Sequence, residues 1–142
     1  MDWILTIWAL ALFSSVGFSE SQLSQNVPPD HIRIQGKLVS LSSRTDNSEM
    51  CQQNPCWAFV QVSKIIGYGS AFRGSVTVSD TVQVKFTTTL LPTQSLFPKR
   101  KNHLPGLVVN DRFQADMKQA ISQDFNNQSN DYEIATYSKK MD

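Results

Sequence analysis

The chain has 142 residues and a formal net charge of +1 at pH 7, so its overall field would not draw it onto nucleic acid or an anionic membrane. That length suits one domain with a single hydrophobic core. Glycine and proline, at six residues each, are too few to indicate a disordered chain. We therefore expect one small globular domain and no nucleic-acid partner.

The N-terminus has the pattern of a secretory signal peptide. The apolar run Trp3–Phe13 is shorter than the roughly 20 residues that span a bilayer, but it has the length of a signal peptide's hydrophobic region. Gly17 and Ser19 supply the small side chains that signal peptidase requires for a cut before Glu20. We predict a signal peptide over residues 1–19 and a secreted protein, either extracellular or periplasmic.

Alternatives for this segment stay open. A cut before Phe18 would also follow small residues, Ser15 and Gly17. The usual basic residues are missing before the apolar run, where Asp2 is the only charged side chain, and this favours an uncleaved anchor or a buried helix. No later run is long enough to span a membrane, so we expect no stable membrane insertion after cleavage.

The two cysteines, Cys51 and Cys56, are close in sequence. In an exported protein such a pair predicts a disulfide bond, which would stabilise the fold by only about 2 kcal/mol because the loop it closes is short. The spacing differs from the redox C-x-x-C motif, and no second pair of cysteines or histidines completes a zinc site. We predict a structural disulfide, no metal site and no cofactor.

Strand patterns dominate the chain after a polar leader. Residues 20–30 end in two prolines, which we interpret as a flexible leader. Residues 31–138 form the predicted domain, and residues 139–142 a short tail. Apolar and polar residues alternate in several runs of the domain, which predicts strands with a buried face. These runs are residues 32–41, Trp57–Ile66, Thr81–Leu90, Arg112–Met117 and Tyr132–Tyr137.

The first run contains two irregularities. Gly36 occupies an inward position, which indicates a bulge or a sharp bend. After Leu38 the apolar positions change phase to Val39 and Leu41, and a second bulge or strand coiling would account for the change.

The second run has apolar residues on both faces. Ala58, Val60 and Val62 share one face, while Trp57 and Phe59 point the other way. This pattern predicts a central strand or a strand that loops cover.

The segment between the last two runs allows two interpretations. Residues 116–125 fit a helix through Met117, Ala120 and Ile121, but the alternation through Met117 favours a strand that continues into a hairpin. Residues 126–131 favour a turn. The final strand is expected to set Tyr132, Ile134 and Thr136 against Glu133, Ala135 and Tyr137.

A short pattern occurs twice. Val78–Val84 and Val109–Ala115 share the form V-[SN]-D-[TR]-[VF]-Q-[VA]. Ser or Asn followed by Asp favours a tight turn, because the short polar side chains bond to nearby backbone amides. The pattern predicts a turn that leads into a strand at both places, and it is too short for a repeat architecture.

These features resemble a known family of barrels. The segment Leu104–Ala115 is similar to the P-G-x-x-x-x-G-D-x-[VF]-x-A sequence of many oligonucleotide/oligosaccharide-binding (OB) barrels, with Asn110 where glycine is usual. With the glycine bend in the first strand, residues 31–138 resemble a secreted netrin-like module of that shape. The resemblance implies an all-β fold, a single small five-stranded OB-like barrel.

Two departures limit what the family's functions imply. Netrin-like modules usually carry several disulfides, and this chain has one possible pair. Inhibitors of that shape use an N-terminal cysteine to reach the metal of a protease, and this chain has no cysteine near its mature N-terminus. The inhibitor mechanism therefore does not carry over, and the fold alone does not fix a function.

Five side chains are candidate ligand contacts. Lys99, Arg100 and Lys101 form a dense basic cluster in a proline-flanked loop, which in an OB-like barrel would lie at one end of the ligand groove and grip phosphate or sulfate groups. Tyr68 and Phe72 flank a glycine turn, where exposed rings would stack on sugars or bases. The alternatives are a solvated loop for the first group and core packing for the second.

Catalytic patterns are missing, so we predict that the chain is not an enzyme. Asp30 precedes His31, but neighbouring side chains on a strand point apart. The carboxylates of Asp80, Asp111 and Asp116 could pair, although the first two are better explained as turn residues. No nucleophile, zinc-protease or phosphate-loop motif is present.

We expect a secreted, non-catalytic binding or interaction module. Its partner would be an extracellular protein or a polyanionic glycan. The alternatives are a secreted enzyme inhibitor or small enzyme, and a structural envelope-associated protein. Asn127 also fits the acceptor pattern for N-glycosylation.

Overall fold

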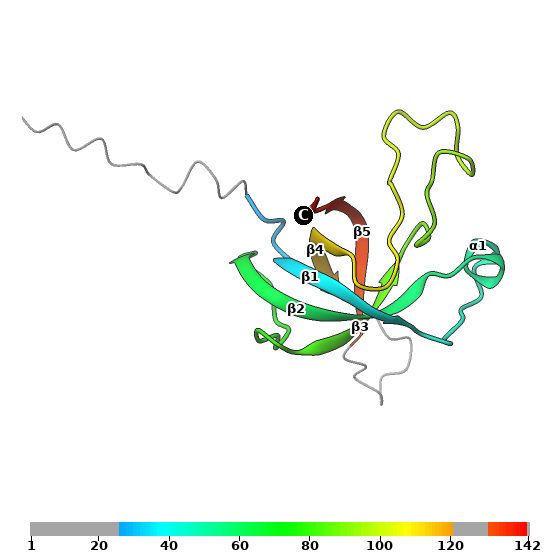
Figure 1. Cartoon of the computed structure of the whole chain (residues 1–142). Coiled ribbons are helices and arrows are strands. Elements are labelled where there is room, and N and C mark those ends of the chain that lie inside the picture. Colours follow the sequence, from blue (N-terminus) through cyan, green and yellow to red (C-terminus); the bar gives the residue numbers. More distant parts are fainter. Residues whose placement is uncertain (1–25, 121–130, 142) are drawn as a thin grey trace, which may run out of the picture.

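A computed structural model of the chain describes residues 26–120 and 131–141. Within these residues the chain forms five strands and one short helix (Figure 1). They are β1 (His31–Leu41), α1 (Glu49–Gln53), β2 (Trp57–Tyr68), β3 (Thr81–Phe86), β4 (Arg112–Gln119) and β5 (Tyr132–Lys139). The strands close into a barrel in the order β1-β2-β3-β5-β4, which confirms the predicted fold class. The predicted signal peptide lies outside the described residues.

The strand directions sort the connections to the two ends of the barrel. β3 pairs with β5 in parallel, and the other neighbours are antiparallel. Residues 42–56, between β1 and β2, and residues 87–111, between β3 and β4, therefore lie at the same end, where β5 also finishes. We call this the disulfide end. Residues 26–30 and the β2–β3 connection, residues 69–80, lie at the other end, which we call the proline end.

The core fills the barrel with the inward side chains of all five strands. The rings of Phe86, Phe113 and Tyr137 meet edge to face, with centroids 5.8–6.2 Å apart. Gly36 leaves room for Val60 and for the Phe113 ring, because a Cβ atom at this position would lie 2.7 Å from Val60 Cγ1 and 3.3 Å from Phe113 Cζ. The β1–β2 register shifts between Gln35 and Gly36, which confirms the predicted bulge.

The second irregularity of β1 is also a bulge, but its consequence differs from the expectation. The register shifts again between Leu38 and Ser40. Val39 and Leu41 are nevertheless 41% and 52% exposed, so they do not return to the core. Beyond Leu38 the strand pairs with β2 alone, since its pairing with β4 ends at Lys37.

The third strand is shorter than predicted. β3 ends at Phe86, although the next amide still bonds to β5, and the chain then turns toward the β1–β2 connection. Thr87 N–H donates to Ile134 O at 3.0 Å, and Leu90 N–H donates to Pro55 O at 2.8 Å. Leu90 still reaches the core, where it is 2% exposed.

The fifth strand corrects the predicted alternation. Tyr137 is buried and Thr136 is exposed, the reverse of the expectation. The β4–β5 register shifts between Ala115 and Met117, and the extra residue in β5 turns Tyr137 inward. The strand interpretation of residues 116–125 holds through Gln119, and residues 121–130 lie outside the described part of the chain.

The repeated V-x-D pattern forms the same turn twice, as predicted. Ser79 and Asn110 have positive φ angles of 78° and 77°. The Asp80 carboxylate accepts a hydrogen bond from Thr77 N–H at 2.9 Å, and Asp111 accepts one from Val108 N–H at the same distance. Both aspartates therefore stabilise turns, as we predicted from the sequence.

Candidate functional site

The β3–β4 connection stands away from the barrel at the disulfide end (Figure 1). Its two arms are joined by backbone hydrogen bonds. Thr93 N–H donates to Leu104 O at 3.0 Å, and Leu107 N–H donates to Leu90 O at 2.9 Å. We call residues 92–106 the basic projection. Its base is a short ladder rather than a free loop.

Buried polar groups fix this base. Thr93 is 2% exposed, and its hydroxyl accepts a hydrogen bond from Leu104 N–H at 2.7 Å. The Tyr137 hydroxyl accepts a hydrogen bond from Gly106 N–H at 2.8 Å. Burial raises the pKa of this phenol and outweighs the hydrogen bond, which acts to lower it. Gly106 has a φ of +85°, and a Cβ there would lie 2.8 Å from Pro92 Cδ. Only glycine fits this approach easily.

The disulfide supports the projection from its neighbouring connection. Cys51 and Cys56 form the predicted bond, and both are buried. Pro55, just before Cys56, presents its carbonyl to the start of the β3–β4 connection. It accepts hydrogen bonds from Leu90 N–H at 2.8 Å and from the Thr89 hydroxyl at 3.0 Å. No local sequence pattern indicates this link, because it joins two loops that are distant along the chain.

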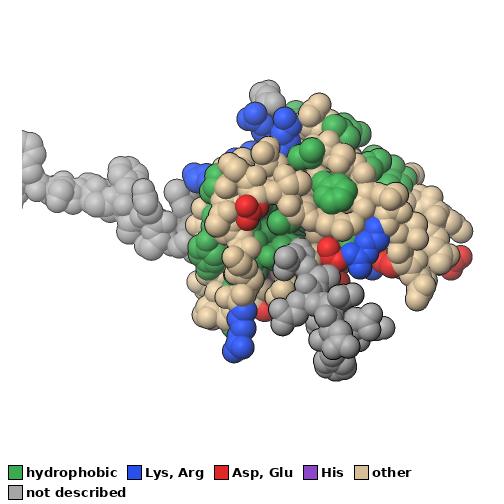
Figure 2. All heavy atoms as spheres, turned by 90° about the horizontal axis from the view of Figure 1, so that it is seen from below, with side chains coloured by type: hydrophobic (Ala, Val, Ile, Leu, Met, Phe, Trp, Pro, Cys, Tyr) green, Lys and Arg blue, Asp and Glu red, His purple; other side chains and the backbone are tan. Residues whose placement is uncertain are grey.

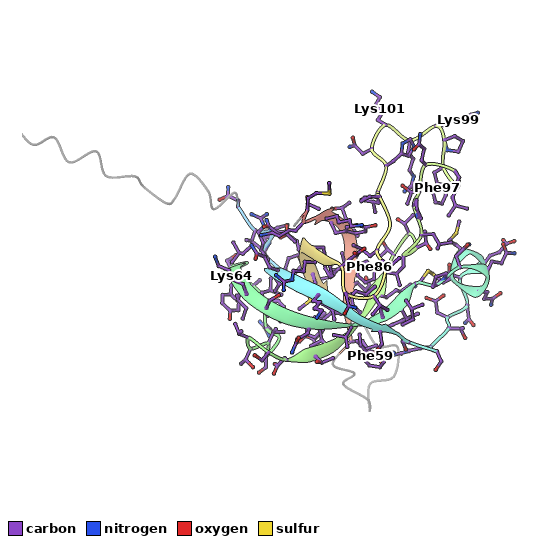
Figure 3. All side chains as sticks on the ribbon, in the orientation of Figure 1. Phe59, Lys64, Phe86, Phe97, Lys99 and Lys101 are labelled. Atoms are coloured by element: carbon purple, nitrogen blue, oxygen red, sulfur yellow. A yellow bond between two sulfur atoms is a disulfide. The ribbon has the colours of Figure 1, made fainter. Side chains whose placement is uncertain are left out.

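The tip of the projection carries the predicted basic cluster. Lys99, Arg100 and Lys101 are exposed, and none of them forms an ion pair within the described residues. Figure 3 shows Lys99 and Lys101 at the outer end of the projection, above Phe97. The whole stretch 87–110 contains no aspartate or glutamate. Its positive charge is therefore not neutralised from within.

The tip is ordered by contacts to Phe97. The guanidinium carbon of Arg100 lies 4.5 Å from the centre of the Phe97 ring, a cation–π contact. The Phe97 carbonyl accepts a hydrogen bond from Arg100 N–H at 3.1 Å and contacts His103 Nε2 at 2.9 Å. An open hollow of about 380 Å³ is lined by Phe97, Pro98, Lys99 and Arg100.

The predicted aromatic pair lies elsewhere. Tyr68 and Phe72 do contact each other, with ring centroids 6.1 Å apart. Tyr68 is 59% exposed, whereas Phe72 packs partly against the core. Both lie at the proline end, opposite the basic projection. The five candidate contacts therefore do not form one site.

The connections of the proline end lie close against the barrel. Ala71 N–H donates to Pro29 O at 2.6 Å, and His31 N–H donates to Pro28 O at 3.0 Å. A Cβ at Gly69 would collide with the carbonyl oxygens of both prolines. Pro28 and Pro29 are thus held against the β2–β3 connection, while residues 20–25 of the expected flexible leader lie outside the described residues.

Side chains from distant parts of the chain cover Trp57, which sequence reasoning missed. The guanidinium of Arg44 lies 4.4 Å from the Trp57 ring centre and pairs with Asp131. Asp46 pairs with Lys85 on β3. Burial acts to raise the pKa of Asp46, but the hydrogen bonds from Lys85 and the backbone prevail and lower it. The outward-pointing tryptophan was the only sign of this cover in the sequence.

Two further aspartates, Asp30 and Asp116, contact basic side chains. Asp116 accepts two hydrogen bonds from the Arg33 guanidinium, at 2.7 and 3.0 Å. Asp30 contacts His31 Nδ1 at 2.6 Å, which corrects the expectation that these neighbours point apart. They meet because Asp30 lies in the turn before β1. The hydrogen bond from His31 lowers the pKa of Asp30.

Elsewhere the surface has another hollow and a mixed charge. A hollow of about 350 Å³ between β3 and the start of β5 is lined mainly by polar side chains, among them Asp80, Gln83 and Asp131. Figure 2 shows positive and negative side chains in small separate groups on the underside of the barrel.

Within residues 26–120 and 131–141, no three His, Cys, Asp or Glu side chains gather as metal ligands. In the same residues no helix has the length and apolarity needed to cross a membrane.

Comparisons with known proteins add no relative to this picture. The chain matches no protein-family model, no curated protein and no solved structure. We therefore infer a function from the geometry of the chain itself.

Proposed function

We propose that this chain is a secreted, non-catalytic binding module and that its basic projection binds a polyanionic glycan. One observation carries the proposal. Three adjacent exposed cations, Lys99, Arg100 and Lys101, stand on a projection that contains no acidic residue. Surface cations in a protein of near-zero net charge usually have acidic neighbours, so a cluster without them has its charge available for a ligand.

The base of the projection supports a binding role. A flexible loop would lose conformational entropy on binding, which lowers affinity. Here the ladder through Thr93 and Leu104, and the bond to the Tyr137 hydroxyl, hold the two arms before any ligand arrives. The cations are thus presented from a base that is already ordered.

Arg100 and Phe97 suit a sulfated or carboxylated sugar. A guanidinium can donate two parallel hydrogen bonds to a sulfate or carboxylate, and it keeps its charge at any physiological pH. The Arg100 guanidinium lies over the Phe97 ring, a contact that favours one position of the cation. The hollow beside it gives a sugar ring a partly apolar surface.

The finer fold assignment belongs to the same proposal. We take the barrel as an OB-type, netrin-like barrel, and the strand order β1-β2-β3-β5-β4 with its parallel β3–β5 pair supports this. The disulfide supports export, since such bonds persist in oxidising compartments. An extracellular location would expose the projection to acidic polysaccharides.

The test replaces Lys99, Arg100 and Lys101 by alanine together. A matched control replaces Lys64, Arg73 and Lys118, which removes the same charge from sites on the other half of the barrel. We expect the projection variant to bind heparin about 10- to 100-fold more weakly, since each exposed charge contact contributes about 0.5–1 kcal/mol. The control should bind like wild type. Equal losses in both variants, or no loss in the projection variant, would refute the proposal.

A further inference from the structure

A second group of cations lies at the foot of the basic projection, on three neighbouring strands. Lys37 of β1 is the cross-strand partner of Arg112 of β4. Lys140, just after β5, donates its backbone N–H to Arg112 O at 2.8 Å. Lys37, Arg112 and Lys140 therefore form one row across the barrel wall, which we call the cationic row.

The three side chains share the outer face of the barrel. Leu38 and Phe113, the strand neighbours of Lys37 and Arg112, are fully buried, so these two side chains point outward by the alternation of the strands. Lys140, opposite Arg112, is exposed. Cross-strand partners have Cβ atoms only about 4.5–5.5 Å apart, and like charges placed directly opposite destabilise a sheet. Such a row costs stability unless an anion is bound there.

Nothing acidic within the described residues relieves this repulsion. No ion pair joins any member of the row to a carboxylate in residues 26–120 and 131–141. The nearest acid along the chain, Asp111, lies 3.2 Å from Lys139 and accepts the Val108 amide. The next outward positions are neutral hydrogen-bonding side chains, namely Gln35, Gln114 and Ser138. The face thus offers three cations flanked by amides and a hydroxyl.

We propose that the cationic row is a second contact for the glycan that the basic projection binds. This inference rests on the proposed function. Arg112 directly follows the β3–β4 connection, so the tip and the row lie on one arm at the same end of the barrel. A linear polyanion with regularly spaced sulfate or carboxylate groups would contact both. A short anion would reach only one of them, and joining two contacts on one chain raises affinity by avidity.

The test compares long and short ligands. A row variant, K37Q/R112Q/K140Q, is titrated with a long heparin chain and with a heparin tetrasaccharide, beside the projection variant and the Lys64, Arg73 and Lys118 control. The row variant should bind the long chain about tenfold more weakly, which corresponds to a loss of about 1.4 kcal/mol in binding free energy. Its affinity for the tetrasaccharide should stay at the wild-type value. The projection variant should lose affinity for both ligands.

Thermal unfolding of the free proteins supplies a second readout. Removing the like-charge contacts should raise the Tm of the row variant by about 1–2 °C. If the three cations instead stabilised the fold, replacing them would lower the Tm. Wild-type affinity for the long chain, or a lowered Tm, would overturn the second contact and leave the projection intact. A projection variant that binds as wild type would instead remove the proposed function and the inference with it.

Discussion

At the proline end the connection before the V-S-D turn lies against the barrel, whereas at the disulfide end the connection before the V-N-D turn stands away from it (Figure 1). The two turns have the same geometry, with positive φ at Ser79 and Asn110. They differ in what precedes them. Pro28 and Pro29 hold down the first connection, while Thr93 and Tyr137 bond the second to itself and to the core. The shared turn therefore sets where each strand begins. The residues that contact the preceding connection determine whether that connection is exposed for binding.

The largest expected effect is at the proline end. Gly69→Ala places a methyl group on the carbonyls of Pro28 and Pro29, so the free energy of unfolding should fall by about 3 kcal/mol in a urea titration. The matched control is Gly67→Ala, whose Cβ would meet Val27 Cγ2 at an ordinary 3.4 Å. Heparin affinity of the folded Gly69 variant should stay at the wild-type value. A marked loss of affinity would show that the two ends are not independent.

Removal of the disulfide should destabilise the fold and also loosen the projection. We expect Cys51→Ser with Cys56→Ser to lower the free energy of unfolding by about 2 kcal/mol. Because Pro55 O holds the amide of Leu90, hydrogen exchange at Leu90 should quicken more than exchange in β4. Uniform acceleration across the barrel would contradict the support that we assign to this connection.

Gly106→Ala changes the base of the projection alone. A non-glycine residue at a φ of +85° is strained, and its Cβ would press on Pro92, so the cost should be about 1–2 kcal/mol. Heparin binding should weaken together with stability, in contrast to Gly69→Ala. Unchanged heparin affinity in a destabilised protein would mean that the order of the base does not matter for binding.

The V-N-D turn should respond to acid. The hydrogen bond from Val108 N–H is the main cause of the lowered pKa of Asp111, with Lys139 as a further cause. A carboxyl whose pKa is depressed by folding stabilises the protein above its unfolded pKa of about 4, and this contribution is lost as the pH falls through the folded pKa. Asp111→Asn should therefore cost about 1 kcal/mol at pH 7 and less at pH 3. Urea titrations at the two pH values check this, and an equal cost at both would contradict it.

The smallest effect is expected at the V-S-D turn. Asparagine tolerates positive φ better than serine, so Ser79→Asn should stabilise the protein by about 0.5 kcal/mol and bring the two turns to the same sequence. Differential scanning calorimetry would detect a rise in Tm. A fall in Tm would show that the two turns are less alike than their φ angles indicate.

Local patterns predicted the strands and turns well, because alternation and Asp side chains act within a few residues. The bulge at Gly36 and both V-x-D turns belong to this class. The face of Tyr137 was mispredicted because one extra residue in β5 reverses every position after it. Sequence alone does not locate a bulge without a glycine.

The candidate site was predictable only in part. The cluster Lys99–Lys101 is continuous in sequence, so it was predicted. Its position relative to Tyr68 was not predicted, because this position depends on which strands close the barrel. The cationic row was missed because Lys37, Arg112 and Lys140 become neighbours only through the β1–β4 and β4–β5 registers. Single charges spread along a sequence look like ordinary solvated positions until the pairing is known.

The most direct test of the account is an NMR titration of the uniformly ¹⁵N-labelled protein with a long heparin chain, following every backbone amide. We predict chemical-shift changes concentrated at residues 97–103 and around Lys37, Arg112 and Lys140, with no change at Tyr68 and Phe72 at the proline end. Shifts centred on Tyr68 and Phe72, or no saturable shifts at any ligand concentration, would contradict the assignment of the basic projection as the binding site.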